Sequence, residues 1–194
     1  MKKGRLEAFS DGVIAIIITI MVLELHVPHG DKLSDLAPLL PVLLSYILSF
    51  VNVGIYWNNH HHMLYAVDRV NGAILWANLH LLFWLSLMPF ATGWMGENHF
   101  AQWPVVLYGI VLVMNGFSYV ILCRLLIQAA GPGSPLAVAL KKDWKGNISV
   151  VIYIVGIILA FVDPRIALGL YVVPAIVWFI PDRRIEKRVS DKKD

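Results

Sequence analysis

The chain has 194 residues, of which 58% are hydrophobic and 15% charged, and its mean hydropathy is +0.69. A soluble domain has about 45–50% apolar and about 25% charged residues, so this composition excludes an ordinary soluble fold and indicates a protein whose solvent is lipid. The formal net charge of +3 does not indicate a nucleic-acid partner, because in a membrane protein the position of each charge matters more than the sum.

Six apolar segments follow one another along the chain, each bounded by proline, glycine or charged residues. A membrane-spanning helix needs about 20 mostly apolar residues. The sequence therefore predicts an all-α integral membrane protein with six transmembrane helices, at residues 5–26, 36–58, 72–92, 102–129, 148–162 and 165–180. One transmembrane domain is expected over residues 1–181, followed by a charged cytoplasmic tail at 182–194.

The last two apolar segments are short, and Asp163-Pro164-Arg165 separates them. Proline disrupts a helix interior, and the charged residues on either side of it indicate a membrane interface. The pattern predicts a tight helical hairpin, with a single long kinked helix as the alternative.

The basic residues predict the orientation of the helices. If the amino terminus is cytoplasmic, 14 of the 16 Lys and Arg residues lie inside and only Lys32 and Arg165 lie outside. Cytoplasmic loops carry an excess of basic residues, so both termini are predicted to be cytoplasmic, with the lipid bilayer as the surrounding partner.

The first helix carries Arg5, Asp11 and Glu24 in or beside an apolar run. An ionisable group at membrane depth costs about 2.5–3.5 kcal/mol on insertion scales, so these side chains are predicted to face protein or water. For Ser10 and Asp11 the alternative is an ordinary helix cap, since both residue types favour that position.

Beyond its polar start the first helix is aliphatic and contains no Thr-Val-Gly-Tyr-Gly filter. Ile16, Ile20 and Leu23 follow one another at i, i+4 and i+7 and form one helical stripe. Around an oligomer axis such a stripe would make hydrophobic rings that close a pore by dewetting. Thr19 adjoins the stripe, and Glu24 would place an acidic ring at the outer mouth. The periodicity alone also fits ordinary packing of a membrane helix.

Three consecutive histidines, His60 to His62, lie at the end of the second predicted helix. Neighbours on a helix point about 100° apart, so a shared metal site is not expected, and no cofactor is implied. A buried carboxylate without a partner is costly, so His60 or His61 is predicted to bond to the first helix. The expected members of this group are Ser10, Asp11, Asn78 and Trp76. Solvation of all three histidines at the interface is the alternative.

Specific motifs recur along the first three segments. They are Arg5-x-x-x-Phe9-Ser10-Asp11-Gly12, the run from Ile16 to Leu25 with Pro28, Trp57-Asn58-Asn59-His60-His61, Arg69-Val70-Asn71, Leu75-Trp76-x-Asn78-Leu79 and Ser86-Leu87-x-Pro89-Phe90. Together they closely resemble the signature of the transmembrane protein 175 family of endolysosomal and prokaryotic potassium channels. The last three segments resemble that family in topology only.

The resemblance implies a six-helix subunit of a homotetramer whose first helices line a pore. It implies that the pore is selective, or weakly selective, for K⁺ as the permeant ion, and that the chain is a multi-pass protein of a prokaryotic cell membrane. Carried onto this sequence, it assigns Ile16 to the main constriction and Ile20 and Leu23 to further hydrophobic layers, with Thr19 as a nearby hydroxyl. A polar network of Arg5, Phe9, Ser10 and Asp11 would fix the first helix against the second and third.

Two other classes of function compete with a channel. A proton-coupled secondary transporter would use Asp11 with His60 or His61 as a proton relay. Transporters often bind substrate at broken helices, whereas the first segment is unbroken from Val13 to Leu25. A membrane oxidase would need clustered histidines on one side of the membrane. Of the seven histidines, three are predicted to lie outside, so an enzyme is not expected.

Overall fold

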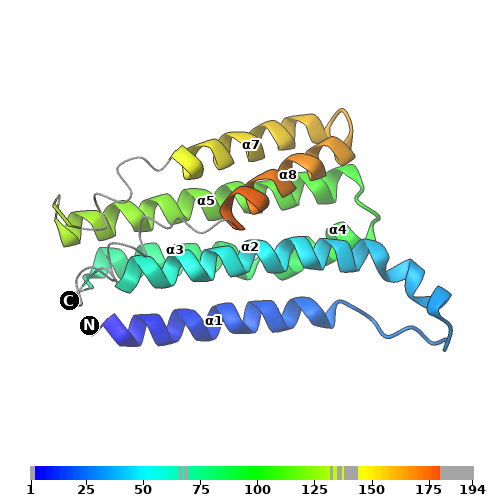
Figure 1. Ribbon diagram of the computed structural model, residues 1–194, viewed down its shortest axis with the longest axis horizontal. Helices are drawn as coiled ribbons and strands as arrows, with labels where there is room; N and C mark the ends of the chain where they lie inside the picture. The colour runs from blue at the N-terminus through cyan, green and yellow to red at the C-terminus, as the bar shows by residue number, and fades with distance from the viewer. Residues whose placement is uncertain are drawn as a thin grey trace.

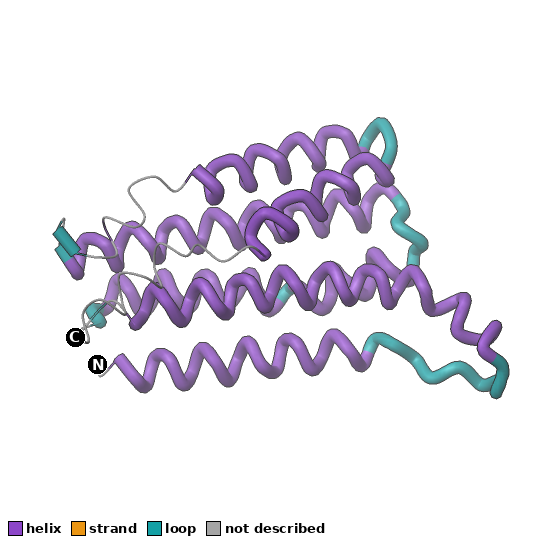
Figure 2. The backbone as a smooth tube through the Cα atoms, in the orientation of Figure 1, coloured by secondary structure: helices purple, strands orange, loops and turns teal. Residues whose placement is uncertain are grey.

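The protein is an antiparallel bundle of helices (Figure 1, Figure 2). The computed structural model describes residues 3–65, 67, 70–131, 133–134, 137 and 144–179. The α-helices are α1 (Lys3–Leu23), α2 (Leu40–Tyr65), α3 (Gly72–Ser86), α4 (Met88–Glu97), α5 (Gln102–Ala130), α7 (Trp144–Ala160) and α8 (Pro164–Phe179), and a 3₁₀ helix, η1 (Leu33–Leu39), precedes α2. The predicted all-α fold is confirmed. The tail at 182–194 lies outside the described residues.

The described helices make six passes through the bundle. Four stretches are long and apolar enough to cross a membrane: Lys3–Leu23, Leu33–Leu64, Gly72–Glu97 and Gln102–Ala130. The last two passes, α7 and α8, are apolar helices of 17 and 16 residues. Lipid offers backbone groups no hydrogen-bond partners, so each pass must satisfy its own groups as a helix.

The third pass differs from its prediction, which was one helix at 72–92. Leu87 separates α3 from α4 and its N–H bonds the Trp84 carbonyl, so the backbone makes a turn there. Pro89 lies in the first turn of α4, where its missing N–H is tolerated. At the other end of the pass, Asn71 caps α3 by accepting from the Ile74 N–H at 2.9 Å.

The ends of the first two passes also differ from prediction. α1 stops at Leu23 rather than at residue 26, because the chain turns there and the His26 N–H bonds the Glu24 carbonyl at 3.1 Å. Glu24 therefore lies outside the helix. α2 continues to Tyr65 rather than 58, so His60 to His62 lie within its last turns.

The helical hairpin predicted at Asp163-Pro164-Arg165 is confirmed, and the single kinked helix is wrong. Asp163 Oδ1 accepts from the Arg165 N–H at 2.8 Å. Pro164 begins α8, a position where its fixed φ suits a helix start. α7 and α8 pack against each other, and α7 also packs along α5.

α1 lies at one edge of the bundle, against α2, α3 and α4 (Figure 1). Within the bundle, buried hydroxyls join α2 to α4 and α5: Ser49 Oγ lies 2.6 Å from Thr92 Oγ1 on α4 and 3.0 Å from the Tyr108 hydroxyl on α5. Such bonds, together with small residues that let backbones approach, hold membrane helices together. The rest of the bundle thus forms a packed support for one side of α1.

Candidate functional site

One face of α1 is buried within the subunit. Its members share exposures of 0–3% and are Leu6, Ser10, Ile14, Ile17 and Met21. They follow one another in steps of four, four, three and four, so they lie on one side of the helix. This face packs against α2, α3 and α4.

The other face of α1 is uncovered and carries the predicted stripe. Ile16, Ile20 and Leu23 are 57%, 43% and 73% exposed, and Gly12 and Thr19 are exposed beside them. In Figure 1 no helix covers the outer edge of α1. The subunit by itself therefore leaves a row of aliphatic side chains about half exposed or more.

Thr19 interrupts this aliphatic row with a hydroxyl. Its Oγ1 donates to the Ile16 carbonyl at 2.9 Å. The hydroxyl proton is thus used within the helix, while the oxygen keeps acceptor capacity. An oxygen of this kind on the uncovered side can interact with a cation.

Glu24 lies one residue beyond α1, where the uncovered face ends. A Cβ atom placed on Gly93 would come within 3.1 Å of Glu24 Oε2. The Glu24 carboxylate therefore lies close against α4 at Gly93.

The buried face of α1 is tied to α2 and α3 by a chain of side-chain hydrogen bonds. Asn78 Nδ2 donates to Ser10 Oγ at 2.9 Å, and Asn78 Oδ1 lies 2.6 Å from His60 Nε2. Since an amide oxygen can only accept, His60 carries its proton on Nε2 and donates it. Ser10 and Asn78 are 0% exposed and His60 is 1% exposed, so no bulk water competes for these bonds.

Asp11 has a different partner from those expected. The Trp57 indole N–H donates to Asp11 Oδ1 at 3.0 Å, whereas His60 bonds Asn78. Sequence reasoning missed this role of Trp57. The available signal was its spacing, because Trp57 lies three residues before His60 on the same helix and so faces the same side.

The remaining predicted members lie outside this chain of bonds. Arg5 and Phe9 are exposed on α1, and Trp76 is 76% exposed on α3. His61 is exposed, with its ring centroid 5.8 Å from that of His62. Among the described residues, no group of three or more His, Cys, Asp or Glu side chains could hold a metal ion.

The fold defines a class, that of multi-spanning helical membrane proteins, and the relatives of this chain are channels rather than enzymes. A potassium channel of Chryseobacterium sp. strain P1-3 is 57% identical over 191 residues, which cover 98% of this chain and 100% of that protein. The family described as endosomal/lysosomal potassium channel TMEM175 matches residues 5–89. The chain belongs to the TMEM175 family.

The similarity extends to structure and to animal proteins. The crystal structure of a lysosomal potassium-selective channel TMEM175 homolog from Chamaesiphon minutus matches with a TM-score of 0.79 at 29% identity, over 92% of this chain and 96% of that one. The endosomal/lysosomal proton channel TMEM175 of Homo sapiens is 31% identical over 116 residues, 54% of this chain and 23% of that protein. The structural match includes the last three helices, for which the sequence motifs indicated topology only.

Proposed function

We propose that this chain is one subunit of a homotetrameric, potassium-selective cation channel, with K⁺ as the permeant ion and α1 of each subunit lining the pore. The observation that carries the proposal is the division of α1 into a buried face and an uncovered face that bears Ile16, Ile20 and Leu23. The names of the bacterial relatives, which are potassium channels, support the choice of ion.

In the proposed pore the side chains themselves form the constriction. Four copies of Ile16 would make the narrowest ring, and Ile20 and Leu23 would add further apolar layers. A narrow apolar ring excludes water when closed and conducts when it widens and wets. Thr19 would offer its hydroxyl oxygen to an ion that has lost part of its hydration shell, since its proton is bonded to the Ile16 carbonyl.

The hydrogen-bonded chain of Ser10, Asn78 and His60 would set the position of α1. These bonds lie on the side of α1 opposite the uncovered face, so they fix the rotation of the helix about its own axis. A rotation of one residue, about 100°, would remove the Ile16 ring from the axis. Packing and buried hydrogen bonds would thus determine which residues meet the ion.

A proton-coupled transporter receives no such support. That mechanism needs Asp11 to exchange protons with His60 or His61, but within the described part of the chain Asp11 bonds Trp57 and His60 bonds Asn78. The first helix is also continuous from Lys3 to Leu23, whereas transporter sites favour discontinuous helices.

Planar-bilayer recording of the reconstituted protein tests the proposal. We expect unitary currents that select K⁺ over Na⁺, and a larger conductance in Ile16→Asn because the polar side chain wets the constriction. Saturable, proton-coupled uptake without unitary currents would show a carrier instead.

Thiol labelling tests the lining directly. In a Cys123→Ala background, which removes the single native cysteine, Ile16→Cys and Leu23→Cys should react with a permeant cationic thiol reagent and lose current. Val22→Cys is the matched control, because Val22 is 42% exposed but points about 120° away from Ile16 around the helix. Equal effects at Val22 and Ile16 would exclude the proposed lining, and a mass of the purified assembly other than four subunits would exclude the tetramer.

A further inference from the structure

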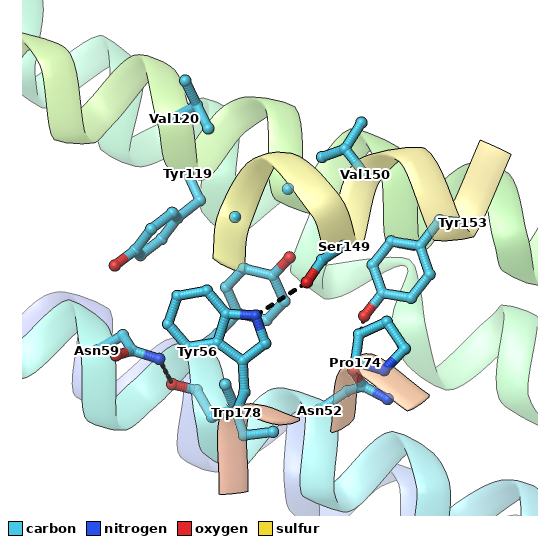
Figure 3. A pocket seen from close by; sticks show the side chains of 13 residues that line it. Asn52, Tyr56, Asn59, Tyr119, Val120, Ser149, Val150, Tyr153, Pro174 and Trp178 are labelled. Carbon is cyan, nitrogen blue, oxygen red and sulfur yellow. Dashed lines mark hydrogen bonds between the residues drawn. The ribbon is translucent and has the colours of Figure 1, made fainter. Parts of the chain in front are cut away.

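The subunit contains a cavity on the far side of α2 from the proposed pore. It has a volume of about 40 Å³ and lies between α2, α5, α7 and α8 (Figure 3). Its hydrogen-bonding lining includes Asn52, Tyr56, Asn59, Ser149, Tyr153 and Trp178. Gly116 also lines it, so part of the space exists because α5 lacks a side chain there.

The size of the cavity decides what it can hold. A buried water needs about 10–15 Å³ of such volume, so this space has room for about two or three waters. A drug-sized ligand needs a pocket of about 300 Å³ or more. The cavity therefore suits water and excludes a drug-sized ligand.

The polar groups around the cavity have spare hydrogen-bonding capacity. The Tyr56 hydroxyl lies near Gly116, where a Cβ would be 3.8 Å from it, and within the described ranges it has no hydrogen-bond partner. Asn59 Nδ2 donates to the Ile55 carbonyl, which leaves the amide oxygen available to accept. The bond from the Tyr153 hydroxyl to Asn52 Oδ1 is long, at 3.5 Å.

The wall of the cavity formed by α7 and α8 is held by shorter hydrogen bonds. Ser149 Oγ donates to the Lys145 carbonyl at 2.8 Å and accepts from the Trp178 indole N–H at 3.0 Å, which joins α7 to α8 (Figure 3). The hairpin thus presents the bonded hydroxyls of Ser149 and Tyr153 to the space. α2 presents the Tyr56 hydroxyl and two amides whose capacity is only partly used, since Asn52 Nδ2 donates to the Leu48 carbonyl at 3.0 Å and Asn59 Nδ2 to the Ile55 carbonyl. Bound water can supply the bonds that α2 lacks.

We infer that this cavity is a water-binding site that links α2 to the α7–α8 hairpin through the Tyr56 hydroxyl and the amides of Asn52 and Asn59. A buried water makes about three hydrogen bonds to otherwise unsatisfied groups, and these side chains provide that number from one helix. The site is formed by α2, α5, α7 and α8 and shares no residue with the uncovered face of α1.

Hydroxyl-radical labelling by X-ray radiolysis tests the inference on the full chain in nanodiscs, because radicals generated from bound water oxidise neighbouring tyrosines that bulk water cannot reach. Tyr153, which is 4% exposed and lines the cavity, should be labelled well above Tyr108 and Tyr171, which are 0% exposed and do not line it. Equal labelling of the three tyrosines would overturn the inference.

Two variants sharpen the test. Gly116→Val places side-chain atoms in the cavity, and Tyr153 labelling should then be lost while Tyr108 labelling is unchanged. In Tyr56→Phe, loss of a hydroxyl that binds water should lower the melting temperature. Removing a hydroxyl from a dry cavity would instead leave the temperature unchanged or raise it, and that result would refute the site. Neither readout requires current, so failure here is distinct from failure of the channel proposal.

Discussion

Replacement of Asn78 by leucine should loosen the attachment of α1, because it removes two buried hydrogen bonds at once. Leucine has a similar volume but neither donates nor accepts, so the Ser10 hydroxyl and the His60 N–H both lose the partner that holds them at 2.9 and 2.6 Å. Because Ser10 and His60 are 0% and 1% exposed, bulk water cannot replace the lost bonds.

The magnitude follows from those two groups. A buried group left without its bond costs about 1–3 kcal/mol in proteins generally, while measured hydrogen bonds between membrane helices average about 0.6 and reach about 1.7 kcal/mol, because the unfolded chain in lipid also finds partners. With two fully buried groups affected, we expect Asn78→Leu to lower the free energy of unfolding by about 2–3 kcal/mol. Ser10→Ala leaves only one Asn78 N–H unbonded and should cost about 1 kcal/mol.

A double-mutant cycle separates this bond from general disruption of the core. In the Ser10→Ala/Asn78→Leu variant the Ser10 change should add little, because its bond is already absent, which gives a coupling energy of about 0.5–1.7 kcal/mol. The assay is denaturant unfolding of the protein in detergent micelles. Ser86→Ala is the control: its hydroxyl donates only to the Phe83 carbonyl and is exposed, so a change within about 0.5 kcal/mol is expected. Additive losses in the cycle would show that Ser10 and Asn78 do not act together.

Two further predictions concern neighbouring contacts. Gly96→Ala should lower the unfolding temperature, at a cost of about 1–3 kcal/mol, because the new Cβ would come within 2.7 Å of the Val42 backbone of α2. Gly54→Ala is the control: a Cβ there has nothing within 4 Å, so this change should stabilise α2 by about 0.5–1 kcal/mol. Equal losses of stability in the two variants would contradict the reasoning. Trp57→Phe should lower the free energy of unfolding by about 1 kcal/mol, because Asp11 loses the indole N–H from which it accepts a hydrogen bond. In an Asp11→Ala background the same substitution should cause no further loss in the same unfolding assay. An additional loss of about 1 kcal/mol in that background would show that Trp57 acts through packing.

The sequence by itself determined the number of passes and the family. Apolar segments of sufficient length must become helices in lipid, because no water is available for their backbone groups. Asp163-Pro164-Arg165 predicted the hairpin correctly, because proline disrupts a helix interior and the charged residues on either side of it favour the membrane interface. The motif from Arg5 to Gly12 pointed to the family, and the spacing of Ile16, Ile20 and Leu23 named side chains that the structure leaves exposed.

Only the tertiary structure decided which of the polar side chains meet. Periodicity assigns residues to a face of one helix, but the rotation and level of each helix against its neighbours depend on packing across the whole bundle. Asn78 therefore lies between Ser10 and His60, and Asp11 faces Trp57 rather than a histidine. The cavity beside Tyr56 arises in the same way, because four helices that are distant in sequence leave it between them.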